Sequence, residues 1–227
     1  MLYALAHPLS LLILLTSFLV AITLHGWVQG VLAVRGGDRT AGQQGRNTPD
    51  PRRHLDPFGA VGAALTGLGW GAPLDEGRRS RRTVLLVSLL GPAANLLLGA
   101  ALLLAWRALY GPIPGEAGGF ADVLQRGTAL PLADLASTSL LLGGISQLYL
   151  GTLNLVPLPP LDGGRLLFAY APKTLGWQKA QHYLVERNIG LVAVLVLLLL
   201  PLGGSSPALP ALLDIVLKPL LTLLLGA

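Results

Sequence analysis

Long apolar runs with very few charges dominate this chain. Three of them are long enough to cross a bilayer as helices, which takes roughly 20 apolar residues: Pro8 to Val34, Thr83 to Trp106 and Pro131 to Leu155. Only 12% of the residues are charged, against about 25% in a typical soluble domain. The sequence therefore predicts an all-α polytopic membrane protein. Two further apolar segments, Ile189 to Leu202 and Pro207 to Leu225, are expected to form its C-terminal membrane helices.

Composition excludes several classes of function. The chain has no cysteine, so disulfides, thiolate catalysis and zinc sites with cysteine ligands are excluded. Its net charge of +5 lies in loops that lack the basic and aromatic platform of nucleic-acid binding, so we expect no nucleic-acid partner. No internal repeat and no separate soluble domain interrupts the pattern. Residues 1–227 are therefore expected to form a single membrane domain in a lipid bilayer.

A short glycine-rich apolar segment, Pro57 to Pro73, separates two arginine-rich loops, Arg35 to Asp56 and Leu74 to Arg82. If this segment crossed the bilayer, the two basic loops would face opposite sides, which the positive-inside rule disfavours. We therefore expect a re-entrant or small β element that dips into the membrane beside the first helix and returns. Such irregular backbone is tolerated only against protein or a water-filled cavity. Both loops are then cytoplasmic.

The run from Asn154 to Gly163 combines an asparagine, three prolines and a carboxylate between two apolar segments. Proline cannot continue a helix, so the backbone is expected to break near Asp162. A carboxylate at membrane depth is costly and needs a partner or a function. His25 is the only histidine within a strongly apolar run. We therefore expect His25 and Asp162 to form the two halves of a metal or substrate site.

Several short motifs follow one another in a recognisable order. They are His25, Gly37-Asp38, Gly45-Arg46, His54-Leu55-Asp56-Pro57-Phe58-Gly59, Gly69-Trp70-Gly71-Ala72-Pro73, Gly91-Pro92-Ala93-Ala94-Asn95 and the run from Asn154 to Gly163. In this order the chain resembles the site-2 protease family of intramembrane zinc metallopeptidases, in its compact bacterial form, over about residues 11–168. The resemblance implies a site-2-protease-like helical bundle in a bacterial plasma membrane. It also implies zinc as the cofactor and a transmembrane helix as the substrate.

Two positions of the family's metal motif are changed. Members carry His-Glu-x-x-His on the first core helix, where the two His bind zinc and the Glu activates its water. By this resemblance, His25 and Asp162 match two of the three ligands, Gly26 replaces the Glu and Gln29 replaces the second His. No catalytic residue is then intact. Two ligands do not hold zinc firmly, so we expect zinc to be absent or weakly bound and peptidase activity to be lost.

Each of these residues also has a structural interpretation. His25 either ligates a metal or hydrogen-bonds a backbone carbonyl or Gln29 within the bundle. Asp162 either is a retained ligand or caps the backbone break by accepting hydrogen bonds from the N–H groups that follow it. His54 either opens a turn at the membrane surface or replaces the missing ligand, if the re-entrant element folds under the first helix.

Two functions remain open. The first is a catalytically degenerate homologue that binds or regulates another membrane protein by pairing with an unwound helix or strand. Its candidate binding residues are Asn154, Pro157, Asn95 and Trp27, and the Trp27 ring is expected to fill the former active-site turn. The second is an active zinc intramembrane metalloendopeptidase whose metal site is rebuilt around His54. An ion or solute pathway would need more facing ionisable residues than the sequence offers.

Overall fold

The computed structural model of the chain describes residues 8–74, 80–113, 118–120, 122, 134–201 and 207–226. Residues 75–79 of the second basic loop and residues 131–133 of the third expected span lie outside this part. The longer helices are α2 (Pro8–Arg35), α5 (Arg81–Tyr110), α7 (Leu135–Asn154), α10 (Ile189–Leu199) and α11 (Ala208–Leu225). The shorter elements are α3 (Arg39–Gln43), η1 (Pro51–Arg53), α4 (Pro57–Thr66), α8 (Asp162–Tyr170), α9 (Leu175–Gln181) and η2 (His182–Glu186). No sheet forms among the described residues, and the expected all-α class is confirmed.

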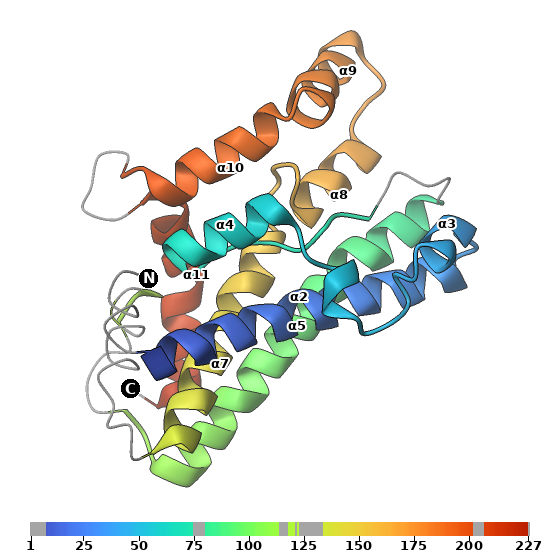
Figure 1. Cartoon of the computed structure of the whole chain (residues 1–227). Helices are drawn as coiled ribbons and strands as arrows, with labels where there is room; N and C mark the ends of the chain where they lie inside the picture. The colour runs from blue at the N-terminus through green and yellow to red at the C-terminus, as the bar shows by residue number, and fades with distance from the viewer. Residues whose placement is uncertain are drawn as a thin grey trace.

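Helices α2, α5 and α7 pack against one another and form the centre of the bundle (Figure 1). By length and composition, α2, α5 and α11 are candidate membrane spans. α7 has 20 residues, most of them buried, and carries Ser, Thr and Gln side chains. A helix shielded from lipid by its neighbours can carry such residues, because small and polar side chains serve packing between helices. The third expected span is thus a buried central helix.

The C-terminal part of the chain folds back on this centre. α11 packs against α5 and α7, and α10 packs against α11 and α4. The Tyr149 hydroxyl of α7 donates a hydrogen bond of 2.6 Å to Asp214 of α11, which ties the last helix to the core. The helix formed by α9 and η2 is bent by 67° against α10, and Asn188 at the bend has a left-handed φ of 55°. The C-terminal apolar region therefore contains one candidate span, α11, and one bent pair.

The segment that was expected to dip into the membrane is a short helix followed by a non-helical return. Asp56 begins α4 by accepting a hydrogen bond of 2.7 Å from the Gly59 N–H, as a helix N-cap does. Gly67 ends the helix in the left-handed conformation, where glycine is favoured. The return segment, residues 68–74, forms a single bridge from Gly71 to Leu55. The β part of the re-entrant element is therefore one bridge, while its body is helical.

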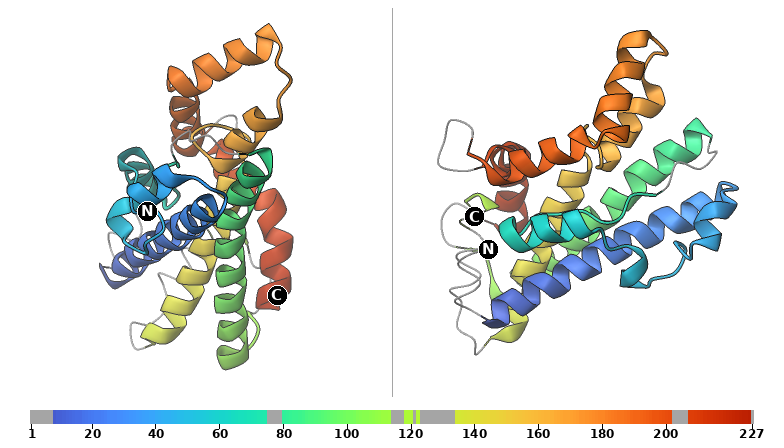
Figure 2. Two further views of the ribbon diagram at one scale, coloured as in Figure 1. Left: turned by 90° about the vertical axis from the view of Figure 1, so that its right-hand side faces the viewer. Right: turned by 45° about the horizontal axis from the view of Figure 1, so that its top comes forward.

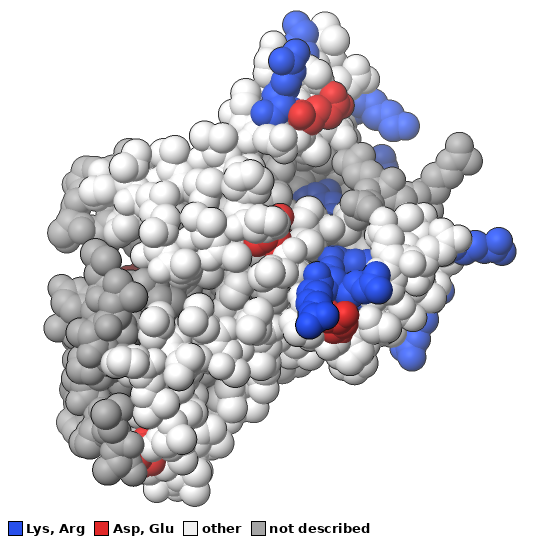
Figure 3. Space-filling model, in the orientation of Figure 1, with Lys and Arg blue, Asp and Glu red and all other residues white. Residues whose placement is uncertain are grey.

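Basic side chains gather at one end of the molecule and around α9, whereas most of the visible face carries no charge (Figure 3). α2 ends and α5 begins at this basic end, as the views in Figure 2 also show. The positive-inside rule assigns such an end to the cytoplasmic side. This arrangement supports a chain that leaves the membrane after α2 and re-enters at α5 on the same side, with α4 as a re-entrant element between them.

Candidate functional site

The structure brings His25 and Asp162 together, although they are 137 residues apart in the chain. His25 lies in the middle of α2, and Asp162 is the first residue of α8, just after the proline-rich break that ends α7. The His25 Nε2 atom lies 2.6 Å from Asp162 Oδ2, and both residues are buried. An ionised carboxylate only accepts hydrogen bonds, so Nε2 carries the proton. Asp162 therefore does not cap the break, and no side chain caps the start of α8.

Gln29, one turn after His25 on α2, also hydrogen-bonds Asp162. Its Nε2 atom donates to Asp162 Oδ2 over 2.7 Å and lies 3.3 Å from the backbone oxygen of Val87 on α5. The side chain is 2% exposed. Gly91 of the Gly-Pro-x-x-Asn motif lies against both His25 and Gln29, so α5 closes the site from the other side. The amide thus acts as a hydrogen-bond donor at the position where the family has its second histidine.

Arg165 is the site residue that the sequence interpretation missed. Its guanidinium donates to Asp162 Oδ1 over 2.8 Å, from one turn further along α8. The signal was present in the sequence, because an acid and a base three residues apart face each other on a helix. With Arg165 on Oδ1 and two donors on Oδ2, both carboxylate oxygens are paired. The buried charge is thereby satisfied within the protein.

His54 lies against Gly26. Its ring is fully buried, and Nε2 hydrogen-bonds the Thr48 carbonyl oxygen at 2.9 Å. A β-carbon on Gly26 would overlap this ring. The ring therefore occupies the space that a side chain at position 26 would need. The Nδ1 atom has no hydrogen-bond partner among the described residues. Burial lowers the pKa of the His54 imidazole, which keeps the ring neutral near pH 7.

A buried arginine holds His54 in this place. The Arg46 guanidinium donates to the backbone oxygens of Arg53 and Ala72, the second over 2.5 Å. It thereby joins the loop before His54 to the return segment after α4. The Ala72 N–H also donates to the His54 carbonyl oxygen over 2.7 Å. The re-entrant element therefore folds against α2, which is the condition under which His54 can approach the site.

The four candidate binding residues do not form one surface. The Asn154 side chain donates to the Leu150 carbonyl oxygen of its own helix over 2.8 Å. Asn95 is buried, and its Oδ1 has no partner in the described part of the chain. Trp27 is 38% exposed and donates to the Asn47 carbonyl oxygen over 3.1 Å. The expectation that the Trp27 ring fills the turn around Gly26 is therefore wrong, because the His54 ring occupies that space.

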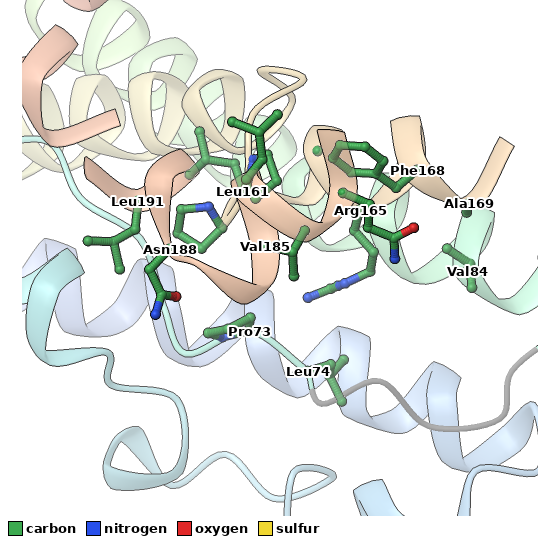
Figure 4. A pocket seen from close by; sticks show the side chains of 15 residues that line it. Pro73, Leu74, Val84, Leu161, Arg165, Phe168, Ala169, Val185, Asn188 and Leu191 are labelled. Carbon is green, nitrogen blue, oxygen red and sulfur yellow. The ribbon is translucent and has the colours of Figure 1, made fainter. Parts of the chain in front are cut away.

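A cavity of about 470 Å³ lies beside the site, between the return segment, α8 and the helices that follow it (Figure 4). Its wall includes Pro73, Leu74, Arg165, Phe168, Leu184 and Leu191. Arg165 belongs to both the wall and the cluster around Asp162. Pro157, the fourth candidate residue, lies on another surface, which is described below. The cavity is largely apolar and has a few polar side chains, as ligand-binding sites commonly do.

Comparisons with known proteins identify the family of this chain. The model of Peptidase family M50, the site-2 protease family, matches residues 16–200. The chain belongs to this family. It is 33% identical over 212 residues to a Bacillus subtilis protein named "Putative zinc metalloprotease YwhC", covering 87% of this chain and 85% of that one. Rip2 of Mycobacterium tuberculosis, named in the same way, is 33% identical over 207 residues, covering 87% and 70%. Rip2 of Mycolicibacterium smegmatis is 31% identical over 208 residues, covering 86% and 71%.

No solved structure is significantly similar to the chain. The family match confirms the resemblance that the motif order indicated, and with three candidate spans it identifies an integral membrane protein. Zinc is the metal named for the M50 relatives.

The donor set does not fit the zinc site of M50 peptidases. A catalytic zinc needs three protein ligands that leave one position open. In the described part of the chain, no three His, Cys, Asp or Glu side chains converge on one point. His25 and Asp162 are bonded directly to each other, and the Gln29 amide points its N–H at the same oxygen. These hydrogen bonds pair both oxygens of Asp162, whereas the buried Nδ1 atoms of His25 and His54 have no hydrogen-bond partner among the described residues.

Proposed function

We propose that this M50 protein binds a segment of another membrane protein without cleaving it. The family's hydrolysis needs a carboxylate beside the metal-bound water. Gly26 supplies none, and the side chain packed against it is the imidazole of His54. Loss of a positioned general base typically lowers a rate by about 10²- to 10⁴-fold. The loss of a metal ligand at Gln29 affects the same step.

The pairing of Asp162 is the observation that carries this proposal. Its carboxylate is already neutralised by Arg165 and accepts hydrogen bonds from His25 and Gln29. A buried charge needs such partners or a metal. Because protein side chains provide them, the fold around Asp162 is satisfied without a cation. The polar groups of the old site then support structure, and the surfaces around it remain for binding.

The cavity beside α8 is the binding surface that we propose for the partner. Its wall includes the run from Pro159 to Leu161 and the end of the return segment, but none of the four binding residues that the sequence indicated. Its wall is apolar apart from a few groups such as Arg165 and Asn188. An unwound membrane segment presents apolar side chains and free backbone carbonyls together, so it matches both features. Small polar solutes match the wall less well.

Metal analysis is the first test. We expect detergent-purified protein, dialysed without chelator, to hold no stoichiometric zinc by elemental analysis. A purified M50 relative with an intact His-Glu-x-x-His motif, treated in the same way, is the control and should retain zinc. Stoichiometric zinc that is lost in His25→Ala would contradict the proposal.

Crosslinking is the second test. Photoreactive residues at Leu74 and Leu184 in the cavity wall should trap a membrane protein at its full, uncleaved length. The same residue at Leu97, which is 72% exposed on α5 and lies outside the cavity, should not trap it. Capture should survive His25→Ala, because that side chain has no part in binding. Equal capture from Leu97, or recovery of the partner as fragments that disappear in His25→Ala, would refute binding without cleavage.

One observation favours the alternative of an active peptidase with a rebuilt metal site. His54 lies beside Gly26 and has a buried Nδ1 without a partner in the described residues. That nitrogen carries a lone pair that could bind a cation if the ring moved toward His25 and Asp162. Zinc that is lost in both His25→Ala and His54→Ala, but is retained in His182→Ala, would establish this alternative. His182 is a matched control because it lies away from the site, on η2.

A further inference from the structure

A second hollow lies on the opposite face of α8. It is an open groove of about 670 Å³ whose wall includes Leu85, Leu155, Pro157, Leu166, Leu167 and Trp177. On α8, residues 163, 166, 167 and 170 line the groove, whereas residues 164, 165, 168 and 169 line the cavity. This spacing assigns the two hollows to opposite faces of one helix. The groove is therefore separate from the proposed partner site.

The groove is apolar along its length and polar at one end. Its inner end at Pro157 and Gly163 adjoins the old metal position, and its outer end is formed by Tyr170, Pro172 and Trp177. The Tyr170 hydroxyl donates to the Arg81 backbone oxygen over 3.3 Å. Tyrosine and tryptophan side chains of this kind concentrate at the level of the lipid headgroups. The groove thus runs from the membrane interface toward the bilayer interior.

A basic side chain stands at the outer end. The Arg81 guanidinium lies 5.7 Å from the centre of the Tyr170 ring, a cation–π contact that fixes its position. No carboxylate pairs with it among the described residues. Arg81 is the first residue of the candidate span α5, so it lies where headgroup phosphates are found. Lys173 follows Pro172 of the groove wall and adds a second positive charge nearby.

We propose that this groove is a binding site for one anionic glycerophospholipid of the surrounding bilayer. One acyl chain lies along the apolar wall, and the phosphate pairs with Arg81. The apolar lining excludes a polar solute, and the membrane supplies the lipid continuously. The positive charge at the outer end selects an acidic headgroup over a zwitterionic one. This inference does not depend on the proposed function, because no groove residue belongs to the cluster around Asp162.

The test uses the full chain, which has no cysteine of its own, with a fluorophore on Leu166→Cys in the groove wall. The protein is reconstituted into phosphatidylcholine vesicles that contain a small fraction of acyl-brominated phosphatidylglycerol or acyl-brominated phosphatidylcholine. We expect the brominated phosphatidylglycerol to quench at about fivefold lower concentration, from the typical attraction of one basic residue to anionic lipid. Arg81→Gln should remove this preference.

Arg52→Gln is the matched control, because Arg52 is also an exposed arginine but lies on η1, away from the groove. It should leave the preference unchanged. Equal quenching by the two lipids in the wild-type background, or an equal effect of both arginine variants, would overturn the proposal. If Arg81→Gln does not fold, Leu85→Trp fills the groove from α5 and should reduce quenching by both lipids. Unchanged quenching in a folded Leu85→Trp protein would equally refute the site.

Discussion

Replacing Gly26 by alanine tests whether His54 has taken the place of a lost side chain. The added methyl group would overlap the His54 ring. That ring is 0% exposed, so it cannot swing into solvent. It must shift within the bundle and weaken its bond to Thr48. We therefore expect Gly26→Ala to destabilise the protein, although alanine is normally the better helix residue.

The magnitude follows from three effects. Forcing an extra methyl group into a filled site costs about 1–3 kcal/mol. Losing the hydrogen bond from His54 costs about 1 kcal/mol, and the helix preference of alanine over glycine returns about 1 kcal/mol. The smaller two cancel, which leaves a net loss of about 1–3 kcal/mol. In a His54→Ala background the overlap disappears, so Gly26→Ala should stabilise by about 1 kcal/mol.

The assay is reversible unfolding in mixed micelles, followed by tryptophan fluorescence for the four members of the double-mutant cycle. Gly143→Ala is a control, because a β-carbon at that position in α7 would meet only ordinary contacts of 3.5 Å or more. The coupling between positions 26 and 54 should be about 2–4 kcal/mol, as for residues in direct contact. A Gly26→Ala protein that is as stable as the wild type while His54 is present would refute the reasoning.

Three further results are expected. Asp162→Ala should lower the free energy of unfolding in the same assay by about 3–5 kcal/mol, because it leaves Arg165 without its carboxylate; a loss near zero would contradict the pairing. Gln29→His restores an imidazole one turn from His25 and should raise zinc retention in elemental analysis above that of the wild type; unchanged retention would show that the ligand geometry is lost. Cysteines at positions 39, 82 and 179 should all react with impermeant reagents from the cytoplasmic side; opposite accessibility of 39 and 82 would make α4 part of a true span.

Much of the fold could be predicted from residue patterns that act locally. The apolar run of α2 and the proline break before Asp162 each depend on a few neighbouring residues, so a bilayer length and a broken helix follow directly. The contact between His25 and Asp162 could also be predicted, because a buried carboxylate needs a partner and the apolar runs contain one histidine. The helical body of the re-entrant element was harder to predict. Pro57 favours the start of a helix, whereas the repeated glycines disfavour a helix.

Other features depend on long-range packing that no local pattern encodes. His54 reaches Gly26 only because Arg46 joins two loops and the return segment lies along α2. Trp27 points outward for a related reason, since its neighbour Gly26 already faces the His54 ring. The groove on α8 required the positions of α5 and α9, which contribute Leu85 and Trp177 to its wall. Arg165 is different, because its spacing from Asp162 was readable in the sequence.

The pair formed by Asp162 and Arg165 has an evolutionary consequence. Both residues belong to the first turn of α8, so their attraction persists whatever happens to the side chains of α2. A substitution that removes a ligand from α2 therefore leaves no solitary charge in the interior, and the folded state survives the change. A single substitution at His25 or Gln29 therefore changes the hydrogen bonds of Asp162 without removing its counter-ion.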